Sequence, residues 1–220
     1  MKSNICKLNE DLTCLEAVLS EVEKVTTYNG LEDKKALRLR LLAEELCGML
    51  AGLIENFSGK FWAENDGEEY ELHAELKADD MSVKLRDELV SVSMSGKNSA
   101  AKGIMGKIRA VAETMLLAAF DADYTPVPVS REYYDYNGFN MGFGYMDPTI
   151  AYETGYVYTW SLFNYKTAVE ENKDEAYDEL ERSIVAKLAD DIIVGVRGKN
   201  VEIVVKKSFG PVYDFINGKK

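Results

Sequence analysis

The chain has 220 residues, of which 46% are hydrophobic and 29% charged, and its formal net charge is -12. This length suits one domain, or one domain with an insertion, and the composition is that of an ordinary soluble globular protein. The acidic balance disfavours nucleic acid and anionic membranes as partners. No apolar run is long enough to cross a bilayer, and the first residues lack the apolar core of a signal peptide, so we expect a cytoplasmic protein.

The three cysteines and the single histidine do not form a metal-binding pattern. Cys6, Cys14 and Cys47 lack the paired spacing of a zinc site, and reduced thiols in a cytoplasm fit them best. His73 lies in an alternating segment with no cysteine or serine partner near it in sequence. We therefore predict no metal site and no enzyme that depends on a catalytic thiol or histidine.

Residues 8–25 are predicted to form the first amphipathic helix. Its apolar stripe consists of Leu12, Leu15, Leu19, Val22 and Val25. Asn29 and Gly30 then provide the chemistry of a turn. A strand before this helix is not obvious unless residues 2–8 supply it.

Residues 36–57 are predicted to form a second, longer amphipathic helix. Its apolar face consists of Leu39, Leu42, Leu46, Met49, Leu50 and Leu53. Gly48 and Gly52 lower helix propensity, and small residues four apart predict close approach to a sheet or a second helix. A plain core helix explains the apolar face, whereas Glu44 and Glu45 beside that face suggest a functional role.

Two strands are predicted after this helix. Residues 70–76 (YELHAEL) and 81–85 (MSVKL) alternate, and the intervening KADD is a plausible hairpin turn. Residues 58–60 and 64–67 have the composition of turns.

A further helix is predicted to begin at Asn98 or Ser99 and to reach Phe120. Its inward residues are Ile104, Ile108, Val111, Met115 and Leu116. The loop before it, residues 93–98, carries a glycine and a lysine, and such a loop can bind an anion through free backbone amides at the helix start. The segment SGKNS lacks the upstream glycine and the preceding strand of a P-loop, so we discount that motif.

Residues 121–165 carry most of the thirteen tyrosines and several glycines. Within them, residues 154–163 (TGYVYTWSLF) are predicted to form a strand. A tyrosine- and glycine-rich surface suits recognition of a partner, and an ordered loop packed through its aromatic rings explains the composition equally well.

The last part of the chain is predicted to be a helix followed by a hairpin. The helix covers residues 164–191 and is closed by Asp190 and Asp191. The hairpin strands are residues 192–196 and 201–205, with a turn between them.

Two of these segments resemble the histidine-kinase-like (GHKL) ATPase fold, and most of all its anti-sigma-factor serine kinase branch. LRLRLLAEELCGMLAGLIENF resembles the first signature helix, and ERSIVAKLADDIIVGVRGKNVEIVVKK resembles the last helix and the last two strands. The resemblance implies an α+β fold, a two-layer sandwich of a mixed, mostly antiparallel sheet with helices on one face. It also implies a single domain over residues 1–220, with a Tyr/Gly-rich insertion or modified lid at about 121–155.

The resemblance assigns a catalytic role to Glu45, but Met49 stands where the family has a residue that binds magnesium. Glu45 falls at the position of the catalytic glutamate, which would act as the general base. Four residues later the family carries an asparagine that helps to hold magnesium, and here Met49 offers only a thioether, a poor ligand for a hard cation. The glycine-rich turn that cradles the phosphates corresponds to residues 178–182 (DELER), whose acids would repel phosphate.

The other candidate residues belong to the nucleotide pocket that the resemblance implies. Asp87 takes the place of the aspartate that binds adenine, although an aspartate after a strand is commonplace and the glycines that should follow it are absent. Gly103 and Gly106 correspond to glycines of the lid, with Lys97 or Lys102 as a phosphate contact, and the two glycines would equally suit a helix-packing face. The cofactors of an intact site would be ATP and magnesium.

Two functions follow from the resemblance. The first is a degenerate protein of this fold with weak or no ATP binding, which acts in bacterial regulation by binding a protein partner. The alternative is an active ATP-binding anti-sigma-factor-type serine kinase or ATPase, in which Glu45 acts as the base. The first is favoured by Met49 and by the acids of residues 178–182.

Overall fold

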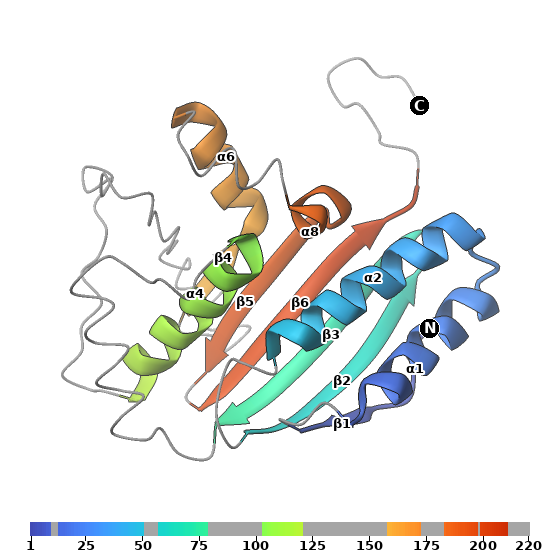
Figure 1. Ribbon diagram of the computed structural model, residues 1–220, viewed down its shortest axis with the longest axis horizontal. Helices are drawn as coiled ribbons and strands as arrows, with labels where there is room; N and C mark the ends of the chain where they lie inside the picture. Colours follow the sequence, from blue (N-terminus) through green and yellow to red (C-terminus); the bar gives the residue numbers. More distant parts are fainter. Residues whose placement is uncertain are drawn as a thin grey trace.

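In the part of the chain that the structure describes, six strands form one sheet and helices pack against it (Figure 1). The computed structural model describes residues 1–9, 13–50, 57–78, 103–120, 158–172, 183–197 and 199–210. The strand order is β1-β2-β3-β6-β5-β4, and every pairing among these described strands is antiparallel. The strands are β1 (Cys6–Leu8), β2 (Phe57–Asp66), β3 (Glu69–Ala78), β4 (Tyr158–Ser161), β5 (Asp191–Arg197) and β6 (Asn200–Ser208).

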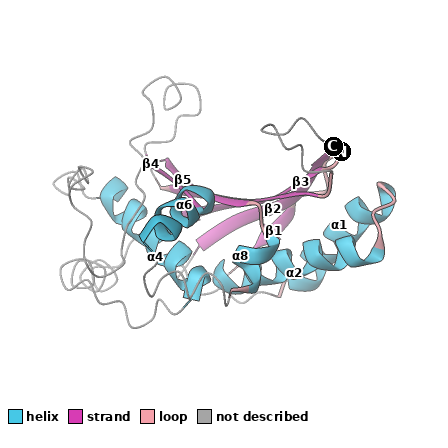
Figure 2. Cartoon of the chain, turned by 90° about the horizontal axis from the view of Figure 1, so that it is seen from above, coloured by secondary structure: helices cyan, strands magenta, loops and turns pink. Residues whose placement is uncertain are grey.

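The helices cover one face of the sheet. They are α1 (Leu15–Tyr28), α2 (Asp33–Leu50), α4 (Gly103–Phe120), α6 (Leu162–Asn172) and α8 (Ile184–Leu188). Figure 2 shows α1, α2, α4 and α8 on the same side of the sheet. Helix α6 packs against β4 and β5, and the ring of its Tyr165 lies against Trp160 of β4. The predicted α+β class, with an antiparallel sheet and helices, is thus confirmed.

The apolar stripes read from the sequence form the core between the helices and the sheet. Leu19, Val22 and Val25 of α1 are buried, and so are the predicted apolar residues of α2 as far as Leu50. Leu15 is partly buried against the same core, and Leu12 and Leu53 lie outside the described residues. All five residues predicted to face inward from α4 are buried as well. None of the described helices combines the length and the apolar character needed to span a lipid bilayer.

The first hairpin differs from the prediction. The strand at residues 70–76 is confirmed within β3, but its hairpin partner is β2 and not residues 81–85, which lie outside the described residues. The prediction of turns at 58–60 and 64–66 was wrong, because Phe61 and Ala63 alternate with solvent-side residues and fill the core. The turn lies at Gly67, whose φ of 66° favours glycine.

The C-terminal half also departs from the prediction. Of the strand expected at 154–163, residues 158–161 are described as β4, Leu162 and Phe163 instead begin α6, and residues 154–157 lie outside the described part. The final hairpin is confirmed as β5 and β6. The single helix expected over 164–191 is described as α6 and α8, and residues 173–182 between them lie outside the described part of the chain. Asp191 opens β5 instead of closing a helix.

Close approach at the glycines of α2 was also predicted, and Gly48 does not show it. Gly48 is exposed, and a Cβ atom placed on it would meet nothing within 4 Å. Gly52 and the Tyr/Gly-rich residues 121–155 lie outside the described residues. A first strand was not obvious from the sequence, and residues 6–8 supply it, because Cys6–Leu8 pair with β2 at the edge of the sheet.

Candidate functional site

Helix α2 presents one flank to α1 and the other to α4 and α8. Arg40 marks the α1 side, because its guanidinium pairs with Glu23 of α1 and its Nε also lies 3.4 Å from Oε1 of Glu44. A helix turns by about 100° per residue, so Glu45 lies about 140° further round than Arg40. Glu45 is therefore on the flank that faces away from α1, where α4 and α8 pack, and it is exposed to solvent.

The predicted phosphate-binding glycines lie on the neighbouring helix. Gly103 is the first residue of α4 and Gly106 follows within the first turn, half-buried. Because α4 packs against α2, the structure places Glu45 and both glycines in one helix layer. Asp87 and Lys97 lie outside the described residues, and the second strand of the hairpin already ends at Ala78.

The described residues of α2 do not fit magnesium held next to Glu45. Met49, one turn after Glu45, is 7% exposed and belongs to the hydrophobic core. Its thioether is a poor ligand for a hard cation, which takes oxygen ligands. The carboxylate of Glu44 is engaged by Arg40. Glu45 is thus the one side chain of this turn that offers an uncommitted carboxylate.

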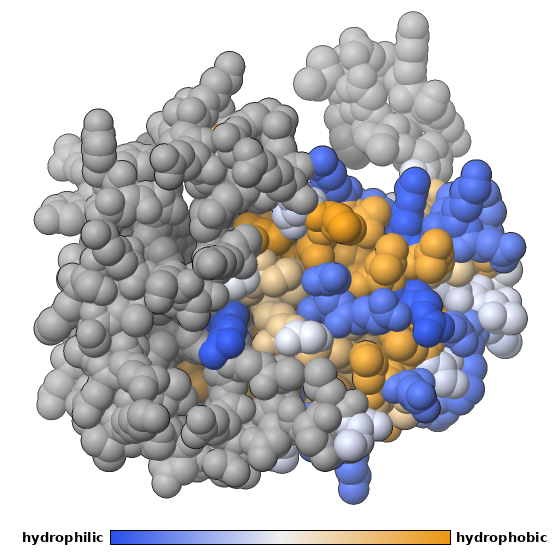
Figure 3. Space-filling view, viewed as in Figure 1, coloured by the Kyte–Doolittle hydropathy of each residue, from blue (hydrophilic) through white to orange (hydrophobic). Residues whose placement is uncertain are grey.

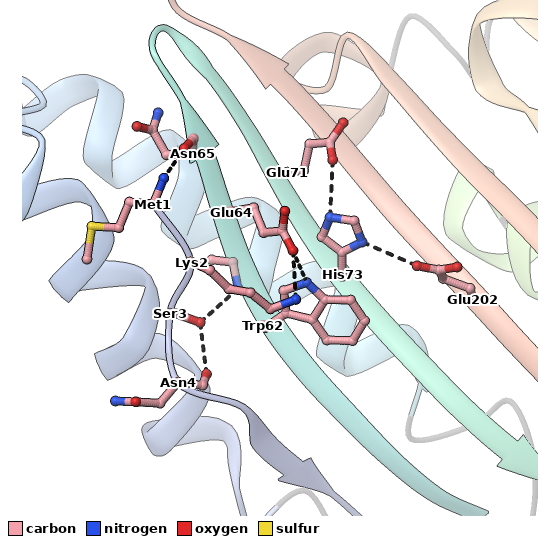
Figure 4. A network of polar contacts seen from close by, with 11 residues as sticks. Met1, Lys2, Ser3, Asn4, Trp62, Glu64, Asn65, Glu71, His73 and Glu202 are labelled. Atoms are coloured by element: carbon pink, nitrogen blue, oxygen red, sulfur yellow. Dashed lines mark hydrogen bonds and ion pairs between the residues drawn. The ribbon is translucent and has the colours of Figure 1, made fainter.

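A second concentration of polar side chains lies on the sheet face opposite the helices (Figure 4). Trp62 of β2 and His73 of β3 are paired in register, and their rings stack with centroids 4.8 Å apart. The two ring nitrogens of His73 face two carboxylates, with Nε2 3.1 Å from Glu71 and Nδ1 3.3 Å from Glu202. Lys206 of β6 lies 2.9 Å from the other oxygen of Glu71.

The same network fastens the first residues of the chain to β2. The Nζ atom of Lys2 lies 2.8 Å from Glu64 and 4.3 Å from the centroid of the Trp62 ring. The indole N–H of Trp62 also donates to Glu64, at 2.7 Å. The hydrogen bond from Lys2, and secondarily that from Trp62, holds the pKa of Glu64 below its usual range although partial burial opposes this.

The contacts of this network join the first residues of the chain, β2, β3 and β6, so its role is structural. Both ring nitrogens of His73 lie within hydrogen-bond distance of carboxylates that belong to this network, so the ring is held between β3 and β6. The two faces of the Trp62 ring are taken by Lys2 and His73. The sequence contained part of the signal, since Glu71, His73 and Glu75 alternate with buried residues, but the stacking of Trp62 on His73 depends on a hairpin register that the sequence analysis assigned differently.

The cysteines offer no reactive thiolate at the core. Burial raises the pKa of the Cys47 thiol to about 12, and burial is also the main cause that raises the pKa of Cys6. A thiol with such a pKa is almost entirely protonated near neutral pH and is a weak nucleophile. The described residues contain no group of three or more His, Cys, Asp or Glu side chains arranged to hold a metal ion.

Large apolar side chains are exposed on the helix side of the molecule. Leu37 and Leu41 lie on the outer face of α2, and Ile184 begins α8. Figure 3 shows apolar surface over these helices, interrupted by hydrophilic side chains. The sequence does not mark these side chains as exposed, because an apolar residue in an amphipathic helix is ordinarily assigned to the core, and Ile184 belongs to the same helical apolar pattern as the buried Val185.

No family model matches this chain, and no curated protein or solved structure matches it.

Proposed function

We propose that this chain is a regulatory protein of the bacterial cytoplasm that binds a protein partner. In this proposal the scaffold is of the histidine-kinase-like type, with weak or no binding of ATP. The order of elements supports the scaffold, since a helix bearing Glu45 is followed by an antiparallel hairpin and, at the end of the chain, by a helix and two more strands. The resemblance of two segments to the anti-sigma-factor kinase branch supplies the regulatory setting.

The observation that carries the loss of ATP binding is the environment of Met49. In the proposed alignment this position should present an amide oxygen to magnesium, and here a thioether is buried in the core. Transfer of a phosphoryl group requires its negative charge to be neutralised, usually by a metal ion. A lone exposed carboxylate at Glu45 would instead repel the triphosphate.

Binding of a protein partner is supported by exposed apolar side chains. Leu37, Leu41 and Ile184 are exposed on helices that pack against each other, whereas most of the described leucines and isoleucines, with Ile5 as another exception, are at least partly buried. Exposed apolar surface of this kind, rimmed by polar residues, is typical of interaction sites.

Isothermal titration calorimetry with magnesium-ATP tests the proposal. We expect no heat of binding in the micromolar range from the full chain. Micromolar binding that is weakened by Glu45→Ala, but not by Glu16→Ala on the exposed side of α1, would overturn the proposal and favour the active serine kinase. The same titration with magnesium-ADP distinguishes recognition of the nucleoside from recognition of the terminal phosphate.

A further inference from the structure

We propose that the outer face of α2 and the adjoining α8 form a docking surface for an amphipathic, acidic helix of a protein partner. We call this the α2–α8 surface, and its members are Lys34, Leu37, Arg38, Leu41, Ile184 and Lys187. The inference rests on the proposed function and adds the location of the surface and the chemistry of its partner.

Three apolar side chains form the anchors of the α2–α8 surface. Leu37 is 56% exposed, Leu41 is 36% exposed and Ile184 is 63% exposed. Leu37 and Leu41 are one turn apart, so they share a face of α2 and are separated by about 6 Å along its axis. Ile184 provides the third anchor, on the neighbouring helix α8.

The end of β6 brings the two helices together. Lys35, near the start of α2, donates from Nζ to the carbonyl oxygen of Phe209 at 3.3 Å. Just after α8, the backbone N–H of Asp190 donates to the carbonyl oxygen of Lys206 at 3.0 Å. Helix α8 also packs directly against α2, and Figures 1 and 2 both show the two helices side by side. The anchors therefore lie on two helices that pack against each other.

Three cations lie among these anchors. By the helical turn of about 100° per residue, Lys34 and Arg38 lie on the flank of α2 away from α1 and toward α8. Lys187 follows Ile184 by one turn, and all three cations are exposed. Among the described residues none of the three has an ion-pair partner. Within the same part of the chain, Lys7, Lys77 and Arg197, at other places on the molecule, also lack one, whereas Lys2, Lys24, Arg40, Lys60, Lys206 and Lys207 pair with acids.

The positive charge of the α2–α8 surface favours a partner that carries carboxylates. A chain with a net charge of -12 has ample acids to pair its cations, so unpaired cations around apolar anchors suit carboxylates from outside. Arg38 can bind a carboxylate through two parallel hydrogen bonds. A second copy of this chain would bring the same cations against each other, which disfavours a symmetric dimer through this face.

A helix is the occupant that fits these dimensions. Apolar residues at positions i, i+3 or i+4, and i+7 of a partner helix form a stripe about 10 Å long, which is long enough to cover Leu37 and Leu41, about 6 Å apart along α2. Acidic residues beside this apolar stripe would lie opposite Lys34, Arg38 and Lys187. Asp33 and Glu45, one turn beyond Leu37 and Leu41, limit the surface at its two ends.

Selection from a displayed library of helical peptides tests the inference on the full chain. The library consists of peptides of about 20 residues with a fixed apolar stripe and with flanking positions that vary among Glu, Lys, Gln and Ser. We expect the selected peptides to carry Glu at the flanking positions. The dissociation constant of the leading peptide, measured by fluorescence anisotropy, should rise by about tenfold or more in Leu37→Glu, Leu41→Glu and Arg38→Glu.

Matched variants and a charge swap complete the test. Ile5→Glu, just before β1, and Lys7→Glu, within β1, alter an isoleucine and a lysine that are also exposed, and they should leave peptide affinity unchanged. A peptide with Lys in place of the Glu that faces Arg38 should bind Arg38→Glu better than it binds the unchanged protein. Selected peptides that are insensitive to all three α2 substitutions would overturn the α2–α8 surface but leave protein binding standing. Failure to select any peptide would count against both proposals.

Discussion

Glu21 shows at the residue scale how this acidic chain stabilises individual charges. Its side chain on α1 is only 10% exposed, and it accepts hydrogen bonds from Lys24 and from the backbone N–H of Asn4. The hydrogen bond from Lys24, followed by those from Asn4, lowers the pKa of Glu21, although burial acts in the opposite direction. The ionised carboxylate thus joins α1 to the segment that precedes β1.

This geometry predicts a pH-dependent cost for Glu21→Gln. We expect a loss of about 1–2 kcal/mol in the free energy of unfolding near neutral pH, because hydrogen bonds to a charged group are removed. A lowered pKa in the folded state gives stability that is present above the ordinary value of 4.5 and is lost as the pH falls through the folded pKa. The difference between variant and unchanged protein should therefore shrink in acid.

Urea unfolding at neutral pH and well below 4.5 measures this difference. Glu16→Gln, an exposed change on the same helix, should cost about 0.5 kcal/mol or less. A penalty for Glu21→Gln that is equal at both pH values would contradict the assignment of the stabilisation to the ionised carboxylate.

At the scale of elements, the start of α6 is secured by a residue from another element. Asp191, the first residue of β5, accepts hydrogen bonds from the Oγ of Ser161 at 3.0 Å and from the backbone N–H of Phe163 at 2.9 Å. Ser161 Oγ in turn accepts from the backbone N–H of Asn164. Free N–H groups at a helix start need such acceptors. This explains why Asp191 begins a strand although the sequence places it where a helix could end.

We expect Asp191→Ala to lower the free energy of unfolding by about 1–2 kcal/mol, because it removes a cap from α6. Relative to the unchanged protein, hydrogen exchange in Asp191→Ala should become faster at the first amides of α6 and change less at the first amides of α2. Asp191→Asn keeps an oxygen acceptor, so it should lower the free energy of unfolding by less than Asp191→Ala does. Equal effects of the two substitutions would show that capping is not the role of this side chain.

Two glycines in different elements should respond in opposite ways to alanine. A Cβ atom on Gly59 of β2 would lie 2.8 Å from Cδ2 of Leu76 and 2.9 Å from the carbonyl oxygen of Glu75, whereas Gly48 of α2 has open space. Gly59→Ala should therefore destabilise the protein by about 1–3 kcal/mol. Gly48→Ala should stabilise it by about 0.5–1 kcal/mol, because alanine favours the helix. Thermal unfolding compares the two, and a stabilising Gly59→Ala would contradict the packing described for β2.

Most helices could be predicted because their apolar residues recur at helical spacing. The stripes of α1, α2 and α4 were recognised in this way, and the final hairpin was evident from two short β-branched runs. Strand β2 was missed because Gly59 and the polar residues around Asn65 have the composition of turns. Only the register with β3 reveals that Phe61 and Ala63 are inward-facing members of a strand.

The candidate site could be predicted only in part. The sequence drew attention to Glu45, and the structure places it with Gly103 and Gly106 in one helix layer. Exposure of Leu37 and Leu41 depends on which flanks of α2 are covered by α1 and α8, and that is a property of tertiary packing. The stack of Trp62 on His73 likewise depends on pairing between strands, which no local pattern specifies.

At the scale of the whole molecule, β3 joins the two halves of the chain. It pairs with β2 on one side and with β6 on the other, so Leu72 lies between Ala63 and Val205 in the sheet and is fully buried. A side chain at this position supports the packing of both halves. Cooperative unfolding of the entire described core is the expected behaviour.

Leu72→Ala should lower the free energy of unfolding by about 2–5 kcal/mol, because it opens a cavity at the centre of the core. Hydrogen exchange should show a similar loss of protection in α2 and in β5, and Lys77→Ala, at the exposed end of β3, should change neither. Loss of protection confined to residues 57–78 would mean that the halves unfold independently.

The same pairing has a consequence for biosynthesis. Residues 69–77 of β3 leave the ribosome long before their partners at 200–208 have been translated. The nascent β1–β2–β3 portion therefore carries an open hydrogen-bonding edge throughout the intervening elongation, and such edges invite aggregation. Completion of the sheet is thus a late event for the growing polypeptide, and chaperones that shield extended segments would act in that interval.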